Sequence, residues 1–174
     1  MDIERVFKAI QAELASLGQP VALAGAFALN AHGISRATAD LDLLVGHEAQ
    51  ESVIRSMERL GFETLYRSEG FSNHLHEDPA LGRVDFIYVE GPTRDALFAG
   101  CELRPFFPGV SVLVPKADHL IAMKVHAMKN DPARRLRDLA DIQSLLRLGG
   151  ADVGSARRLF VKAGLAKDWD ELGL

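Results

Sequence analysis

Hydrophobic positions in the first third of the chain alternate between helical and strand-like spacing. Apolar residues recur every three or four positions after Asp2, which can cap a helix that Gly18 and Pro20 end. Short apolar runs follow, separated by glycines at turns. The pattern predicts helix, strand, helix, strand and helix over residues 3–17, 21–24, 26–32, 41–45 and 48–60. This alternation is typical of an α/β layer.

The middle of the chain has the period-two alternation of β-strands. Strands are expected over 62–66, 71–76 and 83–89, with a hairpin between the last two. A short helix is expected over 93–99. Residues 103–114 predict one or two further strands broken by Pro105 and Pro108.

After Pro115 the spacing becomes helical. Helices are expected over 116–128, 132–148 and 152–162, with a last turn near Trp169. No flexible linker separates this part from the rest. We therefore expect one compact domain, 1–174, in which a mixed twisted sheet flanked by helices (1–112) carries a C-terminal helical segment (113–174).

Composition narrows the class of protein. The 174 residues are 48% hydrophobic and 25% charged, which is typical of a globular chain with one well-buried core. Cys101 is the single cysteine, so an intrachain disulfide and a thiolate metal cluster are excluded. Apolar runs are too short to cross a membrane, and the N-terminus lacks the pattern of a signal peptide. A cytoplasmic location without membrane partners is expected.

The net charge of −4 is unevenly distributed. Residues 1–112 carry 9 Lys/Arg against 16 Asp/Glu, a balance of −7, whereas residues 113–174 carry 11 against 8, a balance of +3. An acidic part that could hold metal is thus joined to a basic part that could hold phosphate. Two differently solvated surfaces would give the same distribution.

Three acids interrupt strands that are otherwise apolar. Alternation places Asp40 and Asp42 on one strand face, and Asp85 is a lone acid in the strand at 83–89. Carboxylates in buried strands need a partner, and magnesium prefers such oxygen ligands. Alternatively, Asp40 caps a strand end and Asp85 pairs with Arg83 or Arg36.

Gly25 lies in a turn between a strand and a helix, where backbone amides can bind a phosphate. Such turns are common, so this one indicates a phosphate site only in combination with the carboxylate pair that follows it. Gly25 permits close approach, and Ala26 offers a further amide.

Together these residues resemble the signature of the nucleotidyltransferase superfamily of the DNA polymerase beta type. The resemblance rests on Gly25-Ala26, thirteen residues, Asp40-Leu41-Asp42, and later Asp85 in VDFIY. The phrases HGISRATADLDLLV, LIAMKVHAMK and RRLRDLADIQSLL are similar to the small bacterial AbiEii-type nucleotidyltransferases, which include toxins of toxin–antitoxin pairs. Ala26 stands where that signature usually has Gly or Ser.

The resemblance implies a role for each matched residue. Gly25 and Ala26 would hold a nucleoside triphosphate (NTP), Asp40 and Asp42 would bind two magnesium ions, and Asp85 would complete the site as ligand or base. Further residues are implied to face the nucleotide: Lys124, which would touch the triphosphate, and the pair Arg137 and Asp138.

Each of the polar residues outside the carboxylates has a second interpretation. Lys124 interrupts an apolar helical stripe, so it reaches a phosphate or an acid, or extends its head into water. Arg36 and Thr38 orient phosphate or brace the loop before the strand. Asp138, with Asp141, Arg134 and Arg137, equally fits a salt-bridged solvated helix. His74 and His76, two apart, fit an ordinary edge strand better than a transition-metal site.

The sequence thus predicts a magnesium-dependent nucleotidyltransferase that moves a nucleoside monophosphate from an NTP to a hydroxyl of tRNA, protein or a small molecule. A toxin role with an antitoxin partner is implied by the resemblance. The alternative is an inactive module of the same fold that binds a nucleotide or a partner. A phosphohydrolase ranks lower, because no cluster of histidine and aspartate accompanies the acids.

Overall fold

A computed structural model describes residues 1–173. The chain divides into two compact units, which are described separately. The sheet unit comprises residues 1–31 and 35–115, and the helical unit comprises residues 32–34 and 116–174. The boundary after Pro115 lies close to the one expected after residue 112. A single compact domain stays a prediction.

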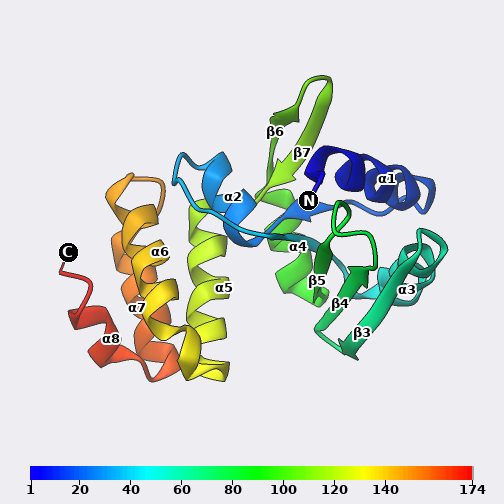
Figure 1. The fold of residues 1–174 in the computed structure, drawn as a ribbon. Helices are drawn as coiled ribbons and strands as arrows, with labels where there is room; N and C mark the ends of the chain where they lie inside the picture. Colours follow the sequence, from blue (N-terminus) through cyan, green and yellow to red (C-terminus); the bar gives the residue numbers. More distant parts are fainter. Residues whose placement is uncertain (174) are drawn as a thin grey trace. The chain divides into compact units, whose positions relative to one another are not determined.

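The sheet unit is built on a seven-stranded mixed sheet with the order β3-β4-β5-β2-β1-β7-β6 (Figure 1). β2 and β5 are parallel, as are β1 and β7, whereas the other neighbouring pairs are antiparallel. The predicted mixed α/β fold is confirmed. The strands are β1 Ala22–Leu23, β2 Asp40–Gly46, β3 Phe62–Ser68, β4 Phe71–His76, β5 Arg83–Val89, β6 Glu102–Phe107 and β7 Val110–Val114.

Four α-helices belong to this unit: α1 Ile3–Ser16, α2 Gly25–Ala31, α3 Gln50–Arg59 and α4 Gly91–Ala99. The Asp2 side chain caps α1 by accepting a hydrogen bond from the Arg5 amide at 3.1 Å. Buried side chains of α1 and α3 meet Phe86 of β5 around one small void, among them Ile10 and Met57. One face of the sheet is thereby closed.

Of the two prolines expected to break the strands of residues 103–114, only Pro108 does so. β6 continues through Pro105, which was expected to break it. β6 is an edge strand with a register shift between Pro105 and Phe107, and a proline is tolerated there because a missing amide donor disrupts no ladder on the open side. Pro108 lies in the turn before β7, where the break was expected.

His74 lies in an interior strand, so the expectation of an edge strand was wrong. β4 pairs with both β3 and β5, and the His74 side chain is fully buried. Its Nε2 is 2.8 Å from Ser72 Oγ, and its Nδ1 is 3.1 Å from Thr64 Oγ1. Ser72 Oγ also lies 2.7 Å from the Tyr88 hydroxyl. These contacts make His74 part of a buried polar network of the core.

We expect His74 to make the protein less stable in acid. Burial lowers the pKa of His74 to about 4, below its ordinary value near 6.5. The unfolded chain therefore binds more protons between these values, and stability falls as the pH drops through this window. Between pH 7 and pH 5 the loss amounts to about 2 kcal/mol. Urea unfolding at both pH values should show this loss in the wild-type protein. His126→Gln, a control at an exposed histidine, should show the same loss, whereas His74→Gln should show none.

The helical unit contains α5 Ala117–Asn130, α6 Arg135–Arg147, α7 Val153–Ala163 and α8 Ala166–Asp170. The expected helix over 132–148 is divided into a 3-10 turn, Pro132–Arg134, and α6. α5 packs against α6 and α7, and α7 packs against α8. The rings of Phe160 and Trp169 meet edge to face, with centroids 5.4 Å apart. Among residues 1–173, no helix is long and apolar enough to cross a membrane.

Candidate active site

The parallel register of β2 and β5 brings the strand acids together. Asp42 lies opposite Asp85, and Asp40 lies opposite Arg83. Residues opposite each other on neighbouring strands point to the same face, so all three carboxylates and the Arg83 guanidinium share one face of the sheet. Alternation along each strand predicted which residues share a face of that strand. The register shows that the two strands are neighbours.

Asp85 is bound by Arg83 in a two-point contact. Arg83 Nε donates to Asp85 Oδ1 at 2.8 Å, and Arg83 Nη2 donates to Asp85 Oδ2 at 3.0 Å. This is the pairing that was the alternative to a metal role for Asp85. The Asp85 side chain is largely buried. The contact fixes the carboxylate in one orientation beside Asp40 and Asp42.

The charges of these residues affect one another. Burial raises the pKa of Asp85, the hydrogen bonds from Arg83 oppose the rise, and the Asp40 charge adds to it. Hydrogen bonding to Asp85 raises the pKa of Arg83, and the charges of Asp40 and Asp42 add to this effect. Arg83 thus partly neutralises a face that carries three acids.

Gly25 packs directly on the carboxylate of Asp42. Its φ of +52° is in the left-handed region, and a Cβ built on it would lie 1.9 Å from Asp42 Oδ2. The Ala24 amide donates to the Asp42 carbonyl oxygen at 2.9 Å. A side chain at position 25 would therefore collide with the acid. This contact joins the glycine turn and the acidic strand in one site, with Ala26 next along α2.

The loop before β2 is braced by local hydrogen bonds. Asn30 Oδ1 accepts from the Arg36 amide at 2.7 Å, and Asn30 Nδ2 donates to the Arg36 carbonyl at 3.1 Å. The Thr38 hydroxyl donates to the Asp40 carbonyl at 3.1 Å and accepts from the Asp40 amide at 3.2 Å. Bracing was one of the two roles expected for this loop. Sequence reasoning missed Asn30, because nothing in the local pattern marks its partner.

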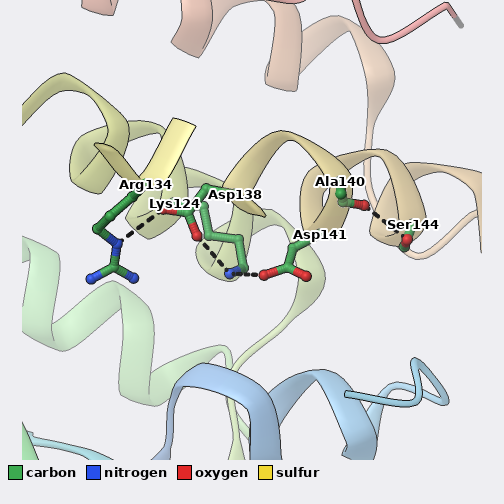
Figure 2. A network of polar contacts seen from close by, with 6 residues as sticks. All are labelled: Lys124, Arg134, Asp138, Ala140, Asp141 and Ser144. Carbon is green, nitrogen blue, oxygen red and sulfur yellow. Dashed lines mark hydrogen bonds and ion pairs between the residues drawn. The ribbon is translucent and has the colours of Figure 1, made fainter. Parts of the chain in front are cut away.

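In the helical unit, Lys124 of α5 is held by two acids of α6. Its Nζ donates to Asp138 Oδ1 at 3.1 Å and to Asp141 Oδ2 at 2.6 Å, and Figure 2 shows it between the two carboxylates. Arg134 Nε donates to the other Asp138 oxygen at 3.2 Å. Lys124 was expected to reach a phosphate, an acid or water, and in the structure it contacts acids.

The acids of α6 do not form a solvated surface. The Asp138 side chain is 0% exposed, and Asp141 is also buried. Two buried carboxylates are satisfied here by a mostly buried ammonium and one guanidinium. Arg137 is exposed on the same helix. A nucleotide-facing role for Lys124, Arg137 and Asp138 stays a prediction.

Asp40 and Asp42 have the chemistry of magnesium ligands. Within residues 1–173, no group of three or more His, Cys, Asp or Glu side chains is arranged to hold a metal ion. Magnesium is commonly held by one or two carboxylates together with substrate phosphates. Asp40 and Asp42 supply such a pair on one strand face. Asp85 as a third ligand stays a prediction, because Arg83 contacts both of its oxygens.

Comparison with known proteins places the chain in one family. Residues 8–171 match the family model described as nucleotidyl transferase AbiEii toxin, type IV TA system. No curated protein matches the chain by sequence.

Several solved structures share the fold. The solution structure of the antibiotic-resistance factor ANT(2'')-Ia is similar with a TM-score of 0.67 and 17% identity, covering 99% of this chain and 97% of that one. A nucleotidyltransferase-like protein from Paracoccidioides brasiliensis is similar with a TM-score of 0.61 and 17% identity, covering 99% and 90%. The lincosamide adenylyltransferase LnuA is similar with a TM-score of 0.54 and 11% identity, covering 83% and 97%.

Proposed function

Because the chain belongs to the AbiEii nucleotidyl transferase toxin family of type IV toxin–antitoxin systems, we propose that it transfers a nucleoside monophosphate from an NTP to an acceptor hydroxyl. One observation carries this proposal: Gly25 packs against Asp42, while Asp42 lies opposite Asp85 in the strand register. The glycine turn and the acidic face thus meet at the Asp42 carboxylate. We further propose that the protein acts in the cytoplasm as a toxin.

Asp40 and Asp42 are the residues that would hold magnesium in this reaction. Bound magnesium would neutralise phosphate charge and orient the attacking and leaving oxygens. Gly25 and Ala26 would leave room for the triphosphate and offer it backbone amides. Most of the catalysis would then be positioning and charge neutralisation by a preformed site.

Asp85 is suited to the acceptor side of the reaction. The acceptor oxygen would bond to the α-phosphorus while the bond to the bridging oxygen breaks and pyrophosphate leaves. Asp85 would accept the hydroxyl proton. Burial raises its pKa above that of an ordinary carboxyl, which makes it a better proton acceptor. Arg83 would hold the carboxylate in place through its two hydrogen bonds.

Ala26 supports a second candidate function, a module that binds a nucleotide without transferring it. A serine hydroxyl contact to phosphate is absent at this position, whereas the amide is retained. Incubation with α-labelled NTPs, magnesium and pools of RNA, protein or small molecules separates the two functions. Labelled product is the result that we expect. Magnesium-dependent nucleotide binding without product would favour the second candidate.

We expect Gly25→Ala to lower the transfer rate by about 100-fold, since displacement of a catalytic group by about an ångström costs this much. The added Cβ would meet the Asp42 carboxylate, which must then move. The measurement is the rate of labelled product formation at saturating NTP.

Gly18→Ala is the matched control. Gly18 also has a left-handed φ, +66°, but nothing lies within 4 Å of a Cβ built there. Both variants therefore place an alanine in a strained left-handed backbone conformation. Only the alanine at position 25 collides with the Asp42 carboxylate. Equal transfer rates for the two variants would show that the Gly25 contact with Asp42 has no catalytic importance.

A further inference from the structure

Beside the carboxylates, one sheet face continues across β5, β4 and β3, which lie side by side (Figure 1). The registers align side chains in rows across this face. The middle row contains Tyr66 of β3, Asn73 of β4, Asp85 of β5 and Asp42 of β2. A line of side chains therefore leads from the edge of the sheet to the proposed site.

This face is open on the β3 side. Tyr66 is 57% exposed, and Leu75 in the neighbouring row is also exposed. The Tyr66 and Phe71 rings lie 6.4 Å apart at a tilt of 42°. The opposite face of the same strands carries Ser72 and His74, which are fully buried. The aromatic pair thus lies on the face that carries the acids, at its exposed β3 end.

Asn73 has an unused polar atom between Tyr66 and Asp85. Its Oδ1 is buried and has no hydrogen-bond partner within residues 1–173. Most buried acceptors in folded proteins have a donor, so this atom is a candidate for contact with a ligand. A small rotation of the amide would present it to a ligand lying on this face.

The two sides of the acids are not equivalent. Gly25 contacts Asp42 from the β1 side, where the proposed function places the triphosphate. The β4–β3 side remains for the acceptor. Strand spacing puts Asn73 about 5 Å and Tyr66 about 10 Å from Asp85. One nucleoside, from its sugar hydroxyl to its base, covers this span.

We propose that Tyr66 and Asn73 form an acceptor subsite for the terminal nucleoside of an RNA chain. The base stacks on Tyr66, the Asn73 amide hydrogen-bonds the sugar, and the sugar hydroxyl faces Asp85. Exposed aromatic rings are the usual platform for unpaired bases. This inference rests on the proposed function, because that function supplies the hydroxyl transfer.

Binding tests the subsite without any turnover. The probe is a short single-stranded RNA with 2-aminopurine as its terminal base, titrated into the protein without NTP and followed by fluorescence quenching. Tyr66→Ala should weaken binding roughly 5- to 150-fold, since loss of one stacking contact has this effect. Tyr66→Phe should bind as wild type does. Leu103→Ala, at an exposed residue of the opposite edge strand β6, should also leave binding unchanged.

Kinetics with magnesium, α-labelled NTP and total cellular RNA give the second measurement. Asn73→Ala should raise KM for RNA and leave KM for the NTP unchanged. Equal RNA binding by Tyr66→Ala and wild type would overturn the subsite, and so would labelling of protein or small molecules in place of RNA. Absence of any labelled product would contradict the proposed function, and the binding measurement would still decide the subsite.

Discussion

Asp42→Asn is expected to lower the rate of nucleotide transfer by about 1,000-fold or more, which corresponds to about 4 kcal/mol of lost transition-state stabilisation. Asparagine has the shape of aspartate, so its contact with Gly25 is retained while the negative charge is lost. Metal affinity should fall together with the rate. Mn²⁺ binding, followed by electron paramagnetic resonance, would measure the metal effect apart from activity.

Asp95→Asn is the control for this charge change. Asp95 is an exposed acid of α4 that contacts Arg94 in the same sheet unit. It should bind Mn²⁺ and transfer nucleotide at the wild-type rate. Unchanged Mn²⁺ affinity in Asp42→Asn would remove Asp42 from the metal site.

The second large effect is expected at Lys124. Lys124→Met would leave the buried carboxylates of Asp138 and Asp141 without their shared ammonium. Removing one partner of a buried ion pair destabilises a protein by about 3–5 kcal/mol. Urea unfolding, monitored by Trp169 fluorescence in the helical unit, would measure the loss. Lys129→Met, at an exposed lysine of α5, should have little effect.

A compensated variant separates structural and functional roles of Lys124. Lys124→Met combined with Asp138→Asn and Asp141→Asn removes the unpaired charges, so it should recover most of the lost stability. If transfer remains low in that folded variant, these residues contribute to nucleotide binding, as the resemblance implies. If transfer recovers with stability, their role is confined to the fold of the helical unit. No recovery of stability would contradict the charge explanation.

Local pattern predicted most elements and the faces of the strand acids. Asp40, Asp42 and Asp85 could be assigned to faces because side chains alternate along a strand. Sheet order could not be predicted in the same way, since it depends on pairing between distant segments. His74 was consequently assigned to an edge strand, although β4 lies between β3 and β5.

The partners of charged residues were harder to predict from the sequence than the elements. The pairing of Asp85 with Arg83 was foreseen as an alternative, because residues two apart on a strand share a face. The partners of Lys124 lie on another helix, 14 and 17 positions away in the sequence. Only the packing of α5 on α6 brings them together. The row from Tyr66 to Asp42 likewise depends on three strand registers, and no single strand contains it.

The position of the transferred label tests the central claim most directly. The protein would be incubated with magnesium, an acceptor pool and one NTP labelled either at the α- or at the γ-phosphate. We expect the α-label to enter the acceptor while the γ-label leaves in pyrophosphate, and we expect Asp42→Asn to form both products about 1,000-fold more slowly or not at all. Transfer of the γ-label to the acceptor, or equal α-labelling by wild type and Asp42→Asn, would contradict the central claim.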